Sequence, residues 1–300
     1  MKTSSENSFV YCNDKLDIMK KLLLLSLLIT ISLNAQEKIL LDHQKWELKS
    51  FKENRVFISE QEGVYLDNIS EPEMYLYKAK GDSITDKAMI ICPGGALLFS
   101  AYEKEGVKLA KKLALNGITA IVLKYRTYPR KGSVIDWAGT LWGKPQVVID
   151  SAKTILPYSS KDALNAIEVI RNNASKYNIN PDKIGLMGFS AGGAVTMEAA
   201  YTSISKNQPN FIAPIYPWMD IVGGQKVPSN KPPAFITCAN NDVWKEIPTS
   251  SVQIYQDWIQ AEAKVELHMF SEGGHGFGMN KINSPVDRWS QLLVDWILAL

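Results

Sequence analysis

Metal-binding residue types are scarce in this sequence, and neither sign of charge is in clear excess. Three cysteines and three histidines among 300 residues argue against a zinc finger or a cysteine-rich metal site. Lysine and arginine number 33 against 31 aspartates and glutamates, and they form no basic cluster, so we expect no nucleic-acid partner. We also expect neither a metal nor an organic cofactor. Any mechanism that needs a histidine has few candidates.

Disorder and fibrous repeats are excluded by composition. Apolar residues make up 46% of the chain and charged residues 21%, which is ordinary globular usage. A chain of 300 residues is long enough to bury a hydrophobic core.

The most apolar run, near the start of the chain, is too short to span a bilayer. Met19-Lys20-Lys21 precedes an apolar stretch at 22–33, and Ala35 follows. A basic segment, an apolar stretch of this length and a small residue are typical of a secretory signal peptide, whereas a membrane span needs about 20 residues. A buried core helix is the alternative. We therefore predict a signal peptide and N-terminal extension at 1–35, cleavage near Ala35 and export to the periplasm or medium. Met1 and Met19 both stay open as the start, and the mature chain should hold no membrane span.

From residue 55 onward, short apolar runs alternate with segments of helical periodicity, which predicts a single domain over 36–300. Such alternation indicates a mostly parallel central sheet with helices on both faces. The early strands lack intervening helices and predict an antiparallel edge. The expected strands are Val56–Ser59, Met74–Ala79, Ala88–Cys92, Ala120–Tyr125, Ile184–Phe189, Phe211–Tyr216, Ala234–Cys238 and Val265–Phe270. The expected helices are 103–115, 161–177 (with Ser160 as its N-cap), 191–203, 249–263 and 286–299.

One long stretch, 127–159, shows no clean period and is predicted to be a loop of the kind that forms lids or binding sites. Its aromatic residues, together with Trp218, can form a wall on which a sugar stacks, or they can pack as a satellite core. The candidates for such a wall are Tyr128, Trp137, Trp142 and Trp218. Cys92 and Cys238, at the ends of apolar strands, are expected to be buried free thiols; a disulfide is the alternative and would require the two strand ends to be near neighbours.

The segment Gly188-Phe189-Ser190-Ala191-Gly192 matches G-x-S-x-G between an apolar strand and a helix. This strand–turn–helix setting is the one that a nucleophile elbow requires. The turn brings strand and helix close together, so the positions around the serine must be small. A glycine-rich turn that serves only helix packing is the alternative interpretation.

A serine hydroxyl needs a base to take its proton and an acid to orient that base. His275, in a glycine-rich loop after the last strand, is the candidate base. His268 lies within that strand, and His43 precedes the expected sheet. Two acids follow late strands, Asp220 and Asp242. We favour Asp242 because its strand and the one before His275 are joined by a single helix and should be neighbours.

The oxyanion of such a mechanism also needs hydrogen-bond donors. Cys92-Pro93-Gly94-Gly95-Ala96 ends an earlier strand in a glycine-rich turn, which can direct backbone N–H groups at a carbonyl oxygen. We expect donors from Gly95 or Ala96 and from Ala191. A plain tight turn is the alternative.

These motifs together resemble the secreted bacterial α/β-hydrolases of the acetylxylan and feruloyl esterase-like group. The matching stretches are Ile91–Ala96 with Glu105-Gly106, Ile118–Arg126, Ile179–Gly193, Pro232–Asp242 and Glu266–Gly278. The resemblance implies an α/β-hydrolase fold, with the nucleophile, acid and histidine at Ser190, Asp242 and His275. The chain departs from the family in having Ala96 where a third glycine is common and in its long 127–159 connection.

The resemblance therefore predicts a serine carboxylic-ester hydrolase that removes acetyl or other small acyl groups from an oligo- or polysaccharide through an acyl-enzyme. A serine peptidase of the prolyl-oligopeptidase type shares the triad, although the chain has no room for the accessory propeller. A catalytically silent binding protein that retains the fold is the third interpretation.

Overall fold

The computed structural model describes residues 36–300 except 43–46, 82, 142 and 225. The predicted signal peptide and its cleavage site lie outside the described residues, and so do His43 and Trp142. Residues Lys38–Leu300 form one compact unit. Within the described part, no helix is both long and apolar enough to cross a membrane.

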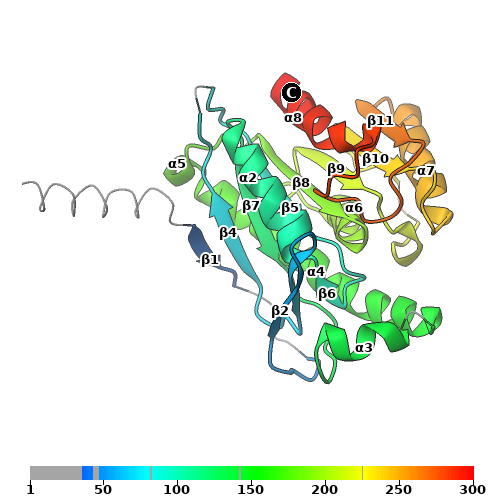
Figure 1. The fold of residues 1–300 in the computed structure, drawn as a ribbon. Helices are drawn as coiled ribbons and strands as arrows, with labels where there is room; N and C mark the ends of the chain where they lie inside the picture. Colours follow the sequence, from blue (N-terminus) through cyan, green and yellow to red (C-terminus); the bar gives the residue numbers. More distant parts are fainter. Residues whose placement is uncertain (1–35, 43–46, 82, 142, 225) are drawn as a thin grey trace, which may run out of the picture. The chain divides into compact units, whose positions relative to one another are not determined.

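The core of the fold is an eight-stranded sheet (Figure 1) in the order β1-β4-β7-β5-β8-β9-β10-β11. The strands from β7 to β11 in this order pair in parallel, and β4 pairs with β7 in antiparallel fashion. The predicted mostly parallel sheet with an antiparallel edge is thus confirmed. The strands are β1 (Glu37–Leu40), β4 (Glu73–Tyr77), β5 (Ala88–Cys92), β7 (Thr119–Lys124), β8 (Ile184–Phe189), β9 (Phe211–Ile215), β10 (Ala234–Ala239) and β11 (Val265–Phe270).

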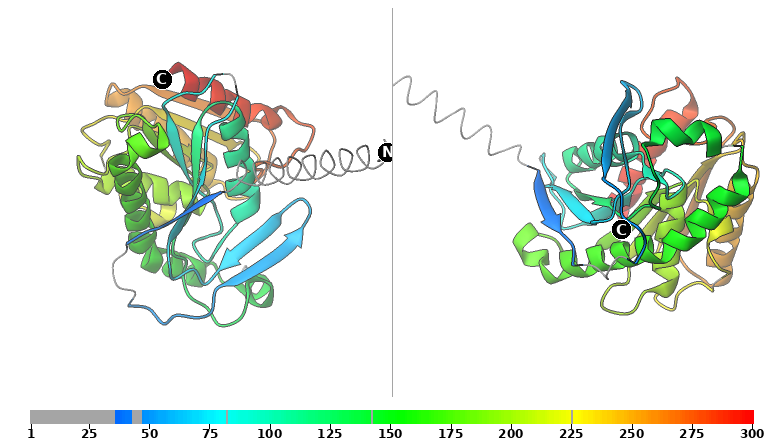
Figure 2. Two further views of the ribbon diagram at one scale, coloured as in Figure 1. Left: turned by 90° about the vertical axis from the view of Figure 1, so that its left-hand side faces the viewer. Right: turned by 90° about the horizontal axis from the view of Figure 1, so that it is seen from below.

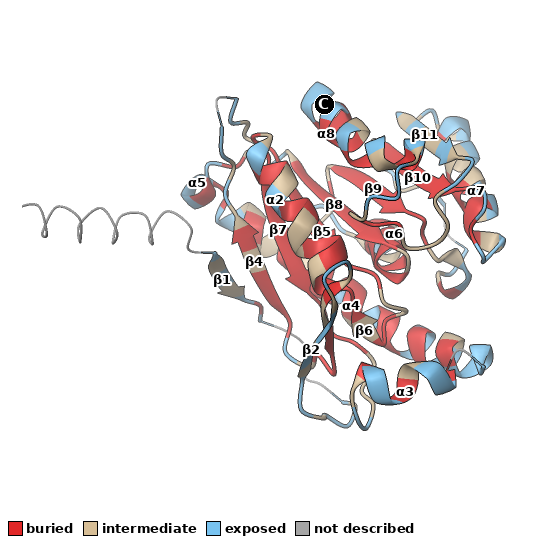
Figure 3. Cartoon of the chain, viewed as in Figure 1, coloured by how far each residue is buried: buried red, intermediate tan, exposed pale blue. Residues whose placement is uncertain are grey.

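The central strands are apolar along their whole length because helices cover both faces of the sheet. Every residue of β5, β7 and β8 is buried (Figure 3). In β5, Met89 and Ile91 pack into one core, whereas Ala88, Ile90 and Cys92 pack into the other. One core is covered by α2 (Lys108–Leu115) and α8 (Trp289–Ala299). The other face carries α4 (Pro145–Asn172), α6 (Ala191–Thr202) and α7 (Glu246–Gln260).

The stretch predicted to be a loop, 127–159, is largely helical, so that prediction was wrong. It contains α3 (Val134–Leu141) and the first half of α4. Ser160 is not an N-cap but lies inside α4, where its hydroxyl donates to the carbonyl of Pro157 over 3.3 Å. Pro145 starts α4, and Pro157 lies within it. A proline normally breaks a helix interior, but here the long apolar face of α4 packs against the sheet on both sides of it.

A second, three-stranded sheet stands apart from the first (Figure 2) and was not expected as a separate unit. It comprises β2 (Asn54–Ser59), β3 (Gly63–Asp67) and β6 (Phe99–Ser100). β2 and β3 form an antiparallel hairpin, and β3 pairs with β6. The strand predicted at Val56–Ser59 therefore exists, but it does not belong to the edge of the central sheet.

The two described cysteines behave as predicted. Cys92 and Cys238 are free and fully buried. Burial raises the pKa of the Cys238 thiol to about 11, so the thiol stays protonated at neutral pH.

Candidate active site

Ser190 stands in a strained turn between β8 and α6. Its φ of 52° is positive, which is uncommon for a residue other than glycine and costs backbone energy. The neighbouring glycines allow the turn, since a Cβ on Gly188 would collide with the carbonyl of Gly192. One on Gly192 would collide with the carbonyl of Cys92 at the end of β5. The spacing of small residues in the sequence thus reflects a close approach of α6 to two strands.

The structure brings Ser190, His275 and Asp242 together in one hydrogen-bonded chain. His275 Nε2 lies 2.9 Å from Ser190 Oγ, and His275 Nδ1 lies 2.8 Å from Asp242 Oδ2. Asp242 is fully buried and also accepts a hydrogen bond from the backbone N–H of Trp244 at 2.9 Å. With the Nδ1 proton donated to the carboxylate, Nε2 is free to accept the serine proton.

The loop after β11, residues 271–280, is called here the histidine loop. Gly274 and Gly276 have φ values of 65° and 70°, a conformation that favours glycine and lets the chain reverse on both sides of His275. The N–H of Gly274 donates to Asn241 Oδ1 over 2.8 Å, which ties the histidine loop to the segment that carries Asp242.

The other candidate acid, Asp220, is exposed on the short 3-10 helix η2 (Met219–Ile221). It lines the same cavity as Ser190. No hydrogen bond joins it to His275 in the part of the chain that the structure describes. His268 lies in β11 against the ring of Phe235, with the ring centroids 4.9 Å apart, away from this chain of hydrogen bonds.

Residues 93–96, called here the glycine loop, follow β5 directly. Gly95 and Ala96 have φ values of 132° and 53°, and both line the cavity with Ser190 and His275. The turn is held by Leu98 and Phe99, whose N–H groups donate to the carbonyl of Gly95 over 3.0 and 3.1 Å. Among the described residues, no acceptor is found for the N–H of Gly95 or Ala96. Ala191, the third expected donor, is the buried first residue of α6.

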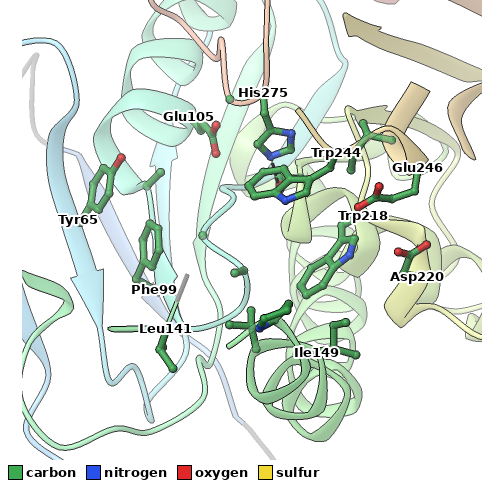
Figure 4. Close-up of a pocket in the computed structure, with 18 of the residues that line it drawn as sticks. Tyr65, Phe99, Glu105, Leu141, Ile149, Trp218, Asp220, Trp244, Glu246 and His275 are labelled. Atoms are coloured by element: carbon green, nitrogen blue, oxygen red, sulfur yellow. Dashed lines mark hydrogen bonds between the residues drawn. The ribbon is translucent and has the colours of Figure 1, made fainter. Parts of the chain in front are cut away.

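Ser190 opens into a cavity of about 370 Å³ (Figure 4). Trp218 lines it, but Tyr128 does not; the side chain of Tyr128 packs against two hydrophobic clusters. Trp137 is buried beside Phe99. Of the predicted aromatic wall, the described part of the chain thus offers only Trp218. The remaining wall is largely apolar and includes Tyr65, Phe99, Leu141, Val148, Ile149 and Trp244. Its charged residues are Lys104, Glu105, Asp220 and Glu246.

Two aromatic neighbours of His275 were missed from the sequence. Trp244 meets the imidazole edge-on at a centroid distance of 4.3 Å, and Tyr216 does so at 5.1 Å. Neither belongs to a recognisable motif. Both follow the carboxyl ends of parallel strands, β10 and β9, where open α/β sheets place ligands, and that position is the signal that could have found them.

No group of three or more potential metal ligands occurs within the described ranges.

Known proteins resemble this chain in sequence and in fold. A profile of the family described as BD-FAE matches residues 150–218, which is less than half of the chain. An acetylxylan esterase from Xylanibacter ruminicola is 25% identical over 243 residues, which cover 71% of this chain and 46% of that protein. The chain thus spans about half the length of this relative.

Solved structures share the fold. An acetyl ester-xyloside bifunctional hydrolase from Caldicellulosiruptor lactoaceticus superposes with a TM-score of 0.58 at 23% identity, covering 76% of this chain and 88% of that one. An α/β hydrolase from a Medee basin deep-sea metagenome library superposes with a TM-score of 0.57 at 24% identity, covering 84% and 100%.

Proposed function

We propose that this chain, which has an α/β-hydrolase fold and resembles carbohydrate esterases in sequence, is a serine carboxylic-ester hydrolase that works through an acyl-enzyme. The observation that carries this proposal is the position of His275 between Ser190 and Asp242, at 2.9 and 2.8 Å. These distances are within the range required for proton transfer from a nucleophile to its base.

The geometry supports a definite sequence of steps. Ser190 Oγ attacks the ester carbonyl carbon while His275 Nε2 takes the hydroxyl proton. The carbonyl oxygen becomes an oxyanion, which the N–H groups of Gly95 or Ala96 and of Ala191 stabilise. His275 then gives the proton to the leaving alcohol, and the acyl group remains on Ser190. Water, activated by His275 in the same way, releases the acid and restores the serine.

We propose that the substrate is an acetylated or otherwise short-acylated carbohydrate. The relative from Xylanibacter ruminicola is an acetylxylan esterase. Trp218 at the cavity wall supplies an apolar face for a sugar ring, and the nearby carboxylates of Asp220 and Glu246 can accept hydrogen bonds from hydroxyl groups. Acetyl esters should be cleaved faster than hexanoyl or longer esters, and a preference for long chains would redirect the assignment toward a lipase.

The test is a panel of p-nitrophenyl esters, acetylated xylo-oligosaccharides and peptide substrates on the purified protein and on Ser190→Ala. Loss of a triad nucleophile should lower ester hydrolysis by about 10³-fold or more. Far-ultraviolet circular dichroism controls for folding. Undiminished turnover in Ser190→Ala would contradict the mechanism, and cleavage of peptides alone would favour the peptidase. A fluorophosphonate probe that does not label Ser190 would favour the silent binding protein.

Export belongs to the same proposal, because a polymer-derived ester is met outside the cytoplasm. Its support is the basic and apolar pattern at 19–35. N-terminal sequencing of protein recovered from the periplasm or medium should find a chain that begins near Gln36. Exported protein that still carries residues 1–35 would contradict processing.

A further inference from the structure

Glu105 is a carboxylate on the cavity wall for which the proposed mechanism has no use. It is only 4% exposed, although it lines the same cavity as Ser190 and His275 (Figure 4). It belongs to η1 (Tyr102–Val107), a π-helical turn directly before α2. Turns of this kind are rare and occur frequently at functional sites. Burying a carboxylate is costly unless hydrogen bonds satisfy it, so its partners are informative.

Each oxygen of Glu105 accepts a hydrogen bond from a different side of the active site. Oε2 accepts from the backbone N–H of Gly94, in the glycine loop, over 2.7 Å. Oε1 accepts from the hydroxyl of Tyr216 over 2.8 Å. Tyr216 in turn accepts from the backbone N–H of Gly278, in the histidine loop, over 3.1 Å. One side chain thus joins the loop of the expected oxyanion donors to the loop of the base.

The direction of these bonds follows from the proton count. The hydroxyl oxygen of Tyr216 accepts the hydrogen bond from the N–H of Gly278, so the single hydroxyl proton of Tyr216 is the one that forms the hydrogen bond to Glu105. Both carboxylate oxygens therefore act as acceptors. Burial raises the pKa of Glu105, against the opposing influence of the neighbouring Lys104 ammonium and of the hydrogen bonds from Tyr216 and Gly94.

Two glycines, from the glycine loop and the histidine loop, lie close against the side chain of Glu105. A Cβ on Gly94 would lie 2.6 Å from Glu105 Oε2 and 3.2 Å from the Cβ of Ser190. A Cβ on Gly278 would lie 3.1 Å from Glu105 Cγ, and Gly278 has a φ of 46°. The carbonyl of Gly278 is also held, because Trp289 Nε1 donates to it over 2.7 Å. Glu105 therefore lies in close contact with two backbone segments, each of which is also held by other contacts.

We propose that Glu105 is a positioning residue that sets the glycine loop and the histidine loop at the separation required for oxyanion stabilisation. The inference rests on the proposed function and deepens it. Glu105 touches the backbone of the glycine loop and, through Tyr216, that of the histidine loop, so it acts through both. Since a displacement of about 1 Å at an active site can cost about 10²-fold in rate, a link of this kind should be visible in kcat.

The variants to compare are Glu105→Gln and Tyr216→Phe, alone and combined. Gln keeps the shape and an oxygen that can accept from Gly94 N–H, but it cannot accept at both ends. Phe keeps the ring against His275 and removes only the hydroxyl. Trp258→Phe is the matched control, because Trp258 Nε1 donates a buried hydrogen bond of 2.8 Å to the carbonyl of Pro232, at the opposite end of the sheet.

Kinetics and inhibitor binding separate positioning from stability. We expect Glu105→Gln to lower kcat by about 10- to 100-fold, at most the lower end of the about 10²- to 10³-fold loss caused by removing an oxyanion-hole donor, with KM changed by less than about threefold. Binding of a trifluoromethyl ketone, which forms a tetrahedral adduct with the serine oxygen, should weaken in parallel. Binding of the alcohol product should not change. Tyr216→Phe should show the same pattern with a smaller loss, and the double variant should lose less than the product of the two. Trp258→Phe should lower the unfolding temperature and keep kcat.

Three outcomes would overturn the inference: wild-type kcat in Glu105→Gln, a change confined to KM, or a loss of kcat in Trp258→Phe equal to that in Glu105→Gln. If Glu105→Gln fails to fold, Tyr216→Phe decides, and an unchanged kcat in it counts against the link. The proposed function fails separately. It is contradicted if the wild-type protein does not hydrolyse esters, or if hydrolysis persists in Ser190→Ala. An active, Ser190-dependent enzyme with an indifferent Glu105→Gln refutes the positioning role alone.

Discussion

The two sides of the cavity are built in opposite ways. The catalytic side consists of short segments after β5, β8, β10 and β11, held by buried hydrogen bonds. The opposite wall comes from α3, the start of α4 and the β2–β3 hairpin, which contribute mainly apolar contacts. Glycines mark the contrast. Gly188 and Gly192 have no space for a Cβ, whereas Gly139 and Gly143 have nothing within 4 Å. We therefore expect substitutions around Ser190 to be tolerated far less than substitutions on the outer side of α3.

Removing the charge of Asp242 should give the largest effect. Asp242→Asn disturbs the tautomer and orientation of His275, because its carboxylate accepts from Nδ1 at 2.8 Å. We expect kcat for an acetyl ester to fall by up to about 10⁴-fold, the scale of the equivalent change in a serine protease. Asp220→Asn is the matched control and should keep most of the activity. The reverse result would assign the acid to Asp220 and leave Ser190 and His275 in place.

Adding one methyl group should change the free energy of unfolding in opposite directions on the two sides of the cavity. Gly192→Ala places a Cβ against the carbonyls of Cys92 and Pro93 and should lower the free energy of unfolding by about 1–3 kcal/mol or more, as overpacking does. Gly139→Ala, on the exposed side of α3, should raise it by about 0.5–1 kcal/mol through helix propensity. Urea denaturation measures both. Equal tolerance at the two positions would remove the proposed contrast.

Loss of an aromatic wall should affect binding more than chemistry. Trp218→Ala removes an indole that lines the cavity and should raise KM for an acetylated xylo-oligosaccharide about tenfold, equivalent to about 1.4 kcal/mol, with a smaller change in kcat. Trp137→Phe, which alters a buried ring outside this cavity, should leave KM unchanged. A change confined to kcat in Trp218→Ala would show that the indole acts on the reacting groups.

The smallest effect is expected on the far wall. Ile149→Ala enlarges the apolar part of the cavity and should raise the ratio of hexanoyl to acetyl ester hydrolysis about three- to tenfold, the scale of one or two methylene contacts. Acetyl ester hydrolysis itself should change little. Val147→Ala, on the exposed side of the same helix, should leave the ratio as it is. If Val147→Ala shifts the ratio equally, the effect does not come from cavity size.

How clearly the apolar residues are patterned explains which features the sequence predicts. Strands such as Ala88–Cys92 and Ile184–Phe189 are recognisable because a parallel strand buried on both faces is a continuous apolar run. Helix α4 was assigned only from residue 161, because Pro157 and the polar residues around it hide the apolar face. That face becomes evident only against the sheet on which it packs.

The sequence by itself determined the turn at Ser190 and the strand-end positions of His275 and Asp242, since close packing around a sharp turn demands glycine at nearby positions. Only the tertiary structure decided which carboxylate meets His275, that Trp244 and Tyr216 flank its ring, and that Glu105 joins two loops. These contacts connect residues far apart in the chain. Their partners are set by strand order and helix packing, which no local pattern of residues encodes.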